Sequence, residues 1–119
     1  MANLDQIANY VADELPYKFN GDYVALGSVV TDGTDKVLSD NISNYKLLII
    51  TVFNDTTKAA EATGIVPVEI FKLYTTVSHS FGVNTYNNGR VYGYLNYVND
   101  TTVHTQISQG RGIAIYGLK

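Results

Sequence analysis

The apolar positions of the first sixteen residues recur at helical spacing. They are Leu4, Ala8, Val11 and Leu15, which would form one apolar stripe on a helix. Asn3 can cap this helix, and Pro16 ends it, because the residue before a proline is disfavoured in the α region. A helix of about three turns is marginal in isolation. The stripe is therefore expected to pack, either on the chain's own domain or between copies of the chain in an oligomer.

From residue 17 onward, short apolar or alternating segments are separated by turn residues. The expected strands cover residues 22–31, 46–53, 65–74, 80–86, 90–98, 101–108 and 113–118. The segment 46–53 is nearly all β-branched or aliphatic, which is typical of a strand buried on both faces. Pro67 indicates an edge or a bulge, and residues 54–64 are expected to form a loop. Asn88-Gly89 is the residue pair of a type I′ hairpin turn.

Short strands at this spacing are typical of a sandwich or barrel. We predict an all-β fold over residues 17–119, namely an antiparallel, jelly-roll-like β-sandwich of about seven or eight strands. One short N-terminal helix over residues 1–16 precedes it and serves oligomerisation or docking. The expected core residues include Leu48, Ile50, Ile70, Leu95 and Ile115.

Composition narrows the classes of partner. The 119 residues suffice for a single domain with its own core, and the absence of cysteine excludes disulfides and thiolate metal ligands. A net charge of −3, with only eight Lys and Arg, argues against nucleic-acid binding, which needs a basic face. No apolar run is long enough for a membrane span. The low share of charged residues, 16%, is compatible with surfaces buried between subunits.

Residues that could carry catalysis or bind a metal are few and scattered. His79 and His104 lie on separate expected strands, and their spacing matches no compact zinc motif. The aspartates sit mostly in turns, where they usually bond to their own backbone, and Asp32, Gly33 and Asp35 lack the remaining ligands of a calcium loop. No nucleophile elbow, zinc-protease helix or phosphate-binding loop occurs. We predict that the chain is not an enzyme and uses no cofactor or metal.

Tyrosine is the one abundant residue type with chemistry suited to recognition. Tyr92 and Tyr94 share a face of one expected strand, and Tyr86 lies across the turn. The predicted ligand-binding surface consists of Tyr86, Asn88, Arg90, Tyr92 and Tyr94, which combine rigid aromatic area with polar groups. The alternative is that these tyrosines are simply good strand formers that lie half buried. The absence of tryptophan weakens an interpretation as a sugar-binding platform.

The polar run LSDNISNY, residues 38–45, leads almost directly into the apolar run at residues 47–50. Its Ser and Asn side chains can satisfy backbone groups in a tight turn, with Ile42 and Tyr45 placed in the core. The segments IVPV, residues 65–68, and IYGLK, residues 115–119, follow in order. Together the three segments resemble the C-terminal β-domain of tail-fibre and related virion proteins in phages and prophages of gut and other Gram-positive bacteria. The resemblance covers residues 26–119.

This resemblance implies a non-enzymatic structural protein of a phage virion, assembled in the bacterial host cytoplasm. Its expected role is that of a fibre tip, a receptor-binding domain that recognises the host surface, including a cell-surface glycan. The alternative is a capsid-attached head fibre or decoration protein that binds another virion protein. In the family the domain usually ends a longer fibre chain, whereas here only a short helix precedes it. Phage fibres are commonly threefold, so the resemblance also implies a homotrimer.

Overall fold

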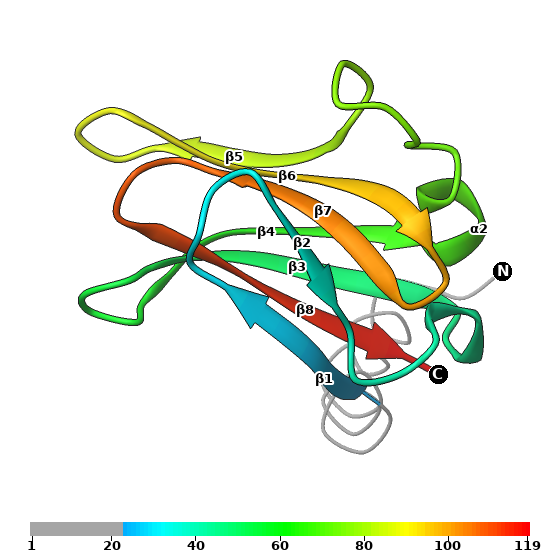
Figure 1. Cartoon of the computed structure of the whole chain (residues 1–119). Helices are drawn as coiled ribbons and strands as arrows, with labels where there is room; N and C mark the ends of the chain where they lie inside the picture. Colours follow the sequence, from blue (N-terminus) through cyan, green and yellow to red (C-terminus); the bar gives the residue numbers. More distant parts are fainter. Residues whose placement is uncertain (1–22) are drawn as a thin grey trace, which may run out of the picture.

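The computed structural model describes residues 23–119, which form two four-stranded antiparallel sheets (Figure 1). The order is β1-β8-β3-β4 in sheet A and β2-β7-β6-β5 in sheet B. Sheet A contains β1 (Tyr23–Val29), β8 (Arg111–Leu118), β3 (Leu47–Asn54) and β4 (Ala60–Pro67). Sheet B contains β2 (Thr34–Val37), β7 (Thr102–Ile107), β6 (Arg90–Asn99) and β5 (Phe81–Tyr86). The remaining elements are the 3₁₀ turn η1 (Ile42–Asn44) and the helical turn α2 (Val68–Phe71).

The predicted all-β antiparallel class is confirmed, with eight strands in the described part of the chain. The helix predicted over residues 1–16 lies outside the described residues, as does its stripe of Leu4, Ala8, Val11 and Leu15. Within residues 23–119, none of the helices has the length and apolar character needed to cross a membrane.

The two sheets face each other across one apolar core. Inward positions of sheet A supply Leu48, Ile50, Val52, Ile113 and Ile115, and those of sheet B supply Val83, Val91, Leu95, Val103 and Ile107. The sheets approach closely at Gly93, where a Cβ would lie 2.8 Å from side-chain atoms of Val52 and Ile113. Because each strand alternates inward and outward residues, this core also determines which side chains reach the two outer faces.

Four of the five named core predictions are confirmed, since Leu48, Ile50, Leu95 and Ile115 are fully buried. The prediction for Ile70 is wrong, because 48% of this residue is exposed. The expected strand over residues 65–74 ends at Pro67, and α2 follows directly. Helical geometry turns Val68 and Phe71 into the core and leaves Ile70 outside.

Two other local predictions need correction. The loop expected over residues 54–64 is only a short turn at residues 55–59, because β3 extends to Asn54 and β4 begins at Ala60. The two strands pair through a bulge near Phe53. Alanine and glutamate are weak strand formers, but the free edge of β3 supplies hydrogen-bond partners that override this weak preference. The β5–β6 hairpin has a three-residue loop, since Tyr86 pairs with Arg90. Asn88 and Gly89 still take the positive φ angles, 52° and 132°, that their residue types favour.

The prediction for residues 38–45 is confirmed. Asn41 caps η1, because its side-chain oxygen accepts a hydrogen bond from the Ser43 backbone N–H at 2.8 Å. Ile42 and Tyr45 are buried in the core. The Tyr45 hydroxyl donates a 2.8 Å hydrogen bond to Asp40, and this bond is the main reason why the pKa of Asp40 is lowered. The polar run therefore orders the start of β3.

Candidate functional site

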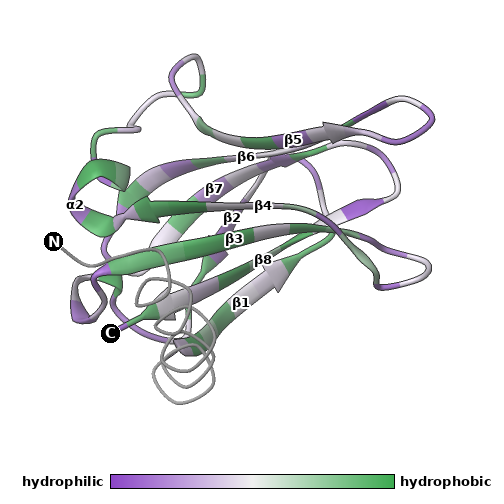
Figure 2. Cartoon of the chain, turned by 180° about the vertical axis from the view of Figure 1, so that it is seen from behind, coloured by the Kyte–Doolittle hydropathy of each residue, from purple (hydrophilic) through white to green (hydrophobic). Residues whose placement is uncertain are grey.

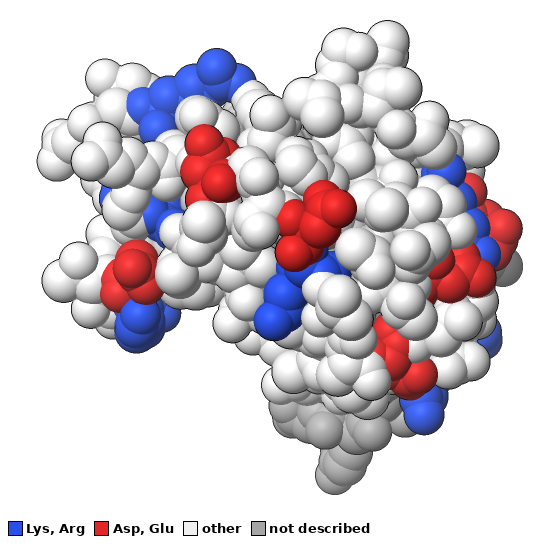
Figure 3. All heavy atoms as spheres, viewed as in Figure 1, with Lys and Arg blue, Asp and Glu red and all other residues white. Residues whose placement is uncertain are grey.

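The outer face of sheet B carries the predicted tyrosines. In β6, Val91 and Leu95 point into the core, so Arg90, Tyr92 and Tyr94 point to the opposite, outer side. Figure 3 shows charged side chains as isolated residues or small groups separated by a largely neutral surface. No extended field of one sign covers the view, which leaves aromatic and neutral polar groups as the main recognition chemistry there.

Arg90, Tyr92 and Tyr94 form one cluster, which we call the tyrosine stack. The rings of Tyr92 and Tyr94 are stacked, with centroids 4.9 Å apart and an interplanar angle of 18°. The Arg90 guanidinium lies 5.0 Å from the Tyr92 centroid and 5.7 Å from that of Tyr94, and it donates a hydrogen bond to the Tyr94 hydroxyl. The rings thus use part of their faces on each other and on Arg90, and they do not form a flat platform.

The edge strand β5 makes room for this arrangement. Gly82 lies opposite Tyr94 in the β5–β6 ladder, and a Cβ at Gly82 would come within 2.9 Å of the Tyr94 ring. The ring therefore covers the backbone of β5 at a position where any larger residue would displace it.

A hollow of about 340 Å³ lies beside the stack. It is lined by Val77, Ser78, Ser80, Tyr94 and Gln106. Gln106 is the β7 partner of Tyr94, and the loop over residues 77–80 closes the side away from Tyr92. The lining combines an aromatic ring, an amide and hydroxyl groups, and it includes no charged residue. Such a set suits a neutral ligand that presents both apolar surface and hydroxyl groups.

The loop that closes the hollow is held by a buried asparagine. Asn96 is 3% exposed, and its side-chain amide donates to the backbone oxygens of Thr76 at 2.5 Å and His79 at 3.3 Å. Its side-chain oxygen accepts a 2.9 Å hydrogen bond from the Ser80 hydroxyl. Because a buried amide with satisfied partners has one favoured orientation, the loop is fixed relative to β6.

The structure brings three of the five predicted ligand-binding residues together, namely Arg90, Tyr92 and Tyr94. Tyr86 pairs with Arg90 in the ladder, but 79% of this residue is exposed and its ring makes no aromatic contact within the described chain. Asn88 lies at the hairpin tip, where it serves the turn. The predicted surface is thus a compact stack with a more exposed hairpin beside it.

Two parts of this site are not predicted from the sequence, namely the loop over residues 77–80 and Gln106. The alternation of Gln106 with buried Thr105 and Ile107 does indicate an outward position. The alternation does not predict that Gln106 lies beside Tyr94. That neighbour depends on the register of β6 with β7, which is shifted by an irregularity between Tyr97 and Asn99.

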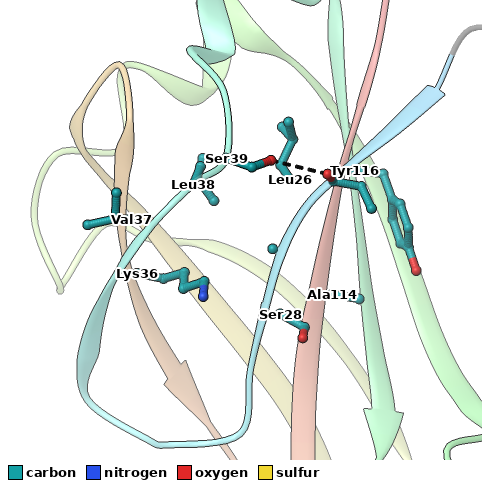
Figure 4. A pocket seen from close by; sticks show the side chains of 10 residues that line it. Leu26, Ser28, Lys36, Val37, Leu38, Ser39, Ala114 and Tyr116 are labelled. Atoms are coloured by element: carbon teal, nitrogen blue, oxygen red, sulfur yellow. Dashed lines mark hydrogen bonds between the residues drawn. The ribbon is translucent and has the colours of Figure 1, made fainter.

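A larger hollow of about 450 Å³ lies where the edge strands β1 and β2 diverge (Figure 4). Its polar side chains are few: Ser39 donates a 3.3 Å hydrogen bond to the Ala25 backbone oxygen, and the Lys36 side chain lies against Gly27. The remaining lining is mainly backbone and small or apolar side chains. This arrangement resembles an open sandwich edge more than a ligand site.

The two histidines lie on either side of Asn96 and bond to different partners, since His104 is the β7 partner of Asn96 and the His79 backbone oxygen accepts a hydrogen bond from its side chain. His104 Nδ1 lies 2.6 Å from a carboxylate oxygen of Asp35, across the β2–β7 pair. His79 lies in a loop, not on a strand as expected, and its Nδ1 lies 3.1 Å from the Thr76 hydroxyl. In the part of the chain that the structure describes, no group of three His, Cys, Asp or Glu residues is placed to hold a metal ion.

A second polar cluster joins η1 to α2 and β6. Asp100 accepts hydrogen bonds from the hydroxyls of Tyr97 at 2.6 Å and Ser43 at 3.2 Å, and Lys72 Nζ lies 3.6 Å away. The Tyr97 bond is the main reason why the pKa of Asp100 is lowered and that of Tyr97 is raised. All these groups are satisfied by one another, so the cluster fastens segments together and offers no free reactive group.

Comparison of the chain with protein-family models, with curated proteins and with solved structures finds no match.

Proposed function

We propose that this chain is a non-enzymatic structural protein of a phage virion. Its sandwich acts as a fibre tip that binds a neutral carbohydrate on the host surface. The observation that carries the proposal is the tyrosine stack beside the uncharged hollow, both on the outer face of sheet B. Aromatic rings contact the apolar faces of sugars, and amide and hydroxyl groups bond to sugar hydroxyls.

The three segments that carry the family resemblance pack against one another in the fold, which supports the proposal that they belong to one common scaffold. The strand β3, which follows the first segment, lies between the other two segments in sheet A, although all three are far apart in the sequence. Leu48 of β3 pairs with Val66 on one side and with Gly117 on the other. Tyr45 packs over Gly117, where a Cβ would lie 2.5 Å from the ring. Because these residues pack on one another, a change in one segment constrains the other two.

A jelly-roll-like winding and a homotrimer belong to the same proposal. The nested pairs β1–β8 and β2–β7 support the winding, whereas β3–β4 and β5–β6 are pairs of sequence neighbours. Three copies on one rigid assembly strengthen weak individual sites through effective concentration. A sedimentation experiment that finds only monomer at micromolar concentration contradicts the trimer.

The binding hypothesis is tested with the double variant Tyr92→Ala/Tyr94→Ala and with Gln106→Ala. We expect the double variant to lose at least about tenfold in affinity for host cell-wall material, and the single variant to lose less. The matched control is Tyr23→Ala/Tyr116→Ala, which removes an edge-to-face tyrosine pair, with centroids 5.6 Å apart, from sheet A. Thermal unfolding and sedimentation establish that each variant keeps its fold and assembly.

Two results contradict the binding hypothesis. One is that the wild-type protein binds no host surface and no member of a glycan array. The other is that the sheet B and sheet A variants lose affinity equally, which makes the effect one of stability.

A decoration protein or head fibre is the second candidate function. Exposed apolar side chains at the α2 end of the molecule favour it: Ile70 is 48% exposed, Leu73 72% and Val98 46%. Residues of this kind suit a contact with another virion protein. If this candidate is correct, Ile70→Ser/Leu73→Ser abolishes binding to virions that lack the protein, while Tyr92→Ala/Tyr94→Ala leaves that binding unchanged.

A further inference from the structure

The outer face of sheet A has an apolar half and a mixed half, in which a row of small and hydroxyl side chains is followed by Phe53 opposite Gly112 and Ala60. Two ladder rows make up the apolar half: Tyr23, Leu118, Leu47 and Pro67 in the first, and Ala25, Tyr116, Ile49 and Ile65 in the second. The next row contains Ser28, Ala114, Thr51 and Thr63. Seen from behind, the apolar colouring of β3 and β4 is concentrated toward α2 (Figure 2).

The apolar half is not an extension of the core. Its residues point away from sheet B, and Ile65 and Tyr23 are 51% and 40% exposed. Neither of the two rows contains a charged residue. A continuous apolar area of this kind on a sheet face is typical of a surface that another element covers.

We propose that the apolar half of this face is the docking surface for the chain's own segment 4–15. This inference does not depend on the proposed function. The stripe of Leu4, Ala8, Val11 and Leu15 supplies the complementary apolar surface. A helix over these residues would be about 16 Å long and about 10 Å wide. Two rows across four strands measure about 14 Å by about 7 Å, so a helix that crosses the strands covers both rows.

The connection between the segment and the face is short enough. The segment ends at Leu15, and Tyr23 is itself part of the first apolar row. The eight peptide steps between them span at most about 26 Å when extended, which is more than the width of the sheet. A neighbouring copy is therefore not required to bring the stripe to this face.

Charge is compatible with the same arrangement. Residues 1–22 contain one basic residue, Lys18, and four acidic residues, Asp5, Asp13, Glu14 and Asp22, whereas residues 23–119 have seven of each sign. On a helix, Asp13 points away from the stripe and Asp5 lies at its flank. Docking on an uncharged surface leaves these carboxylates in water and places none of them against a like charge.

The chain has no cysteine, so engineered pairs can test the contact without background. Ile65→Cys is combined in turn with Leu4→Cys, Ala8→Cys and Val11→Cys. We expect at least one pair to form an intrachain disulfide under mild oxidation, because docked residues come within the roughly 7 Å Cα separation that a disulfide allows. The matched control is Asn9→Cys with Ile65→Cys, which should react at least about tenfold more slowly, since Asn9 lies off the stripe.

The pattern of products decides the outcome. Intrachain disulfide from a stripe position, with little from Asn9→Cys, supports docking. Disulfide-linked dimers in place of intrachain product overturn it and assign this face to a second copy of the chain. Equal and slow reaction at all four positions also overturns it. Thermal unfolding of the reduced variants controls for the fold.

Chymotrypsin cleavage after Tyr10 provides an independent measure of docking, because a docked segment is cleaved more slowly. The variant Ile49→Ser/Ile65→Ser, which makes the face polar, should accelerate this cleavage.

Discussion

The two outer faces of this sandwich differ although the inner faces are alike. Both sheets turn a continuous set of aliphatic residues to the shared core. On the outside, sheet B presents the tyrosine stack and an uncharged polar hollow, whereas sheet A presents two rows dominated by aliphatic and aromatic side chains. The same strand alternation therefore produces one face suited to a polar ligand and another suited to being covered by protein.

This difference indicates separate roles for the sheets. A polar outer face can remain in water and bind ligands reversibly, because its groups are satisfied by solvent in the free state. An apolar outer face is stabilised when another element covers it. The proposed recognition surface accordingly lies on sheet B and the proposed docking surface on sheet A.

The largest effect should come from the core that both faces share. Replacing Ile50, which is fully buried, by Ala should lower the free energy of unfolding by about 2–5 kcal/mol. The matched control is Ile70→Ala, which should cost less than about 0.5 kcal/mol because the side chain is exposed. Equilibrium urea unfolding measures both. Equal losses of unfolding free energy at the two positions would mean that Ile50 does not point into the core.

Substitutions at two glycines compare the inner face of sheet B with its outer face. Gly93→Ala should cost about 1–3 kcal/mol, because the new Cβ pushes Val52 and Ile113 away from sheet B. Gly82→Ala should cost less, since it displaces only the surface ring of Tyr94, and it should alter the near-ultraviolet circular dichroism of the stack. A larger loss at Gly82 than at Gly93 would contradict this assignment of the two faces.

Coupling energies between neighbouring side chains allow a direct comparison of the two outer faces. A double-mutant cycle on Tyr92 and Tyr94 should give a coupling of about 0.5–1.5 kcal/mol, as expected of stacked aromatic residues. The cross-strand pair Thr51–Thr63 on sheet A, with hydroxyl oxygens 3.2 Å apart, should give about 0.2–1 kcal/mol. Chemical denaturation of the four variants in each cycle provides the values. Zero coupling between the tyrosines would mean that they do not stack in solution.

The smallest effect concerns acid stability at the turn before β3. The Tyr45 hydrogen bond lowers the pKa of Asp40 in the folded state, so this carboxylate stabilises the fold above its unfolded pKa of about 3.9. That contribution is lost as the pH falls through the lower, folded pKa. Asp40→Asn should therefore be less stable than wild type at neutral pH, and the difference should shrink below about pH 4. Urea unfolding midpoints of both proteins across this pH range test the prediction. A stability difference that does not change with pH would mean that the variant loses packing and not a charge interaction.

The sequence determined most of the strand inventory, because alternation and turn chemistry are local. A strand over residues 46–53 and the cap at Asn41 could be predicted from neighbouring residues alone. The expectation that this strand is buried on both faces is wrong, because in β3 only the inward residues Leu48, Ile50 and Val52 are fully buried. The position of Ile70 could not be predicted, because it depends on whether the chain continues as a strand after Pro67 or turns into α2. The strand β2 was not predicted, and neither was the start of β4 at Ala60, where pairing with the edge of β3 overrides weak local preference.

The candidate site likewise combines features that local sequence predicts with features that depend on the tertiary structure. Tyr92 and Tyr94 share a face by period-two alternation, which the sequence determines for any strand. Only the tertiary structure decided that their rings stack under Arg90, and that Gln106 and the loop at Ser80 lie beside them. The apolar rows of sheet A likewise appear only when β1, β8, β3 and β4 are set in register. Register between strands that are distant in sequence is chosen by the packing of the whole core, so short-range patterns do not contain it.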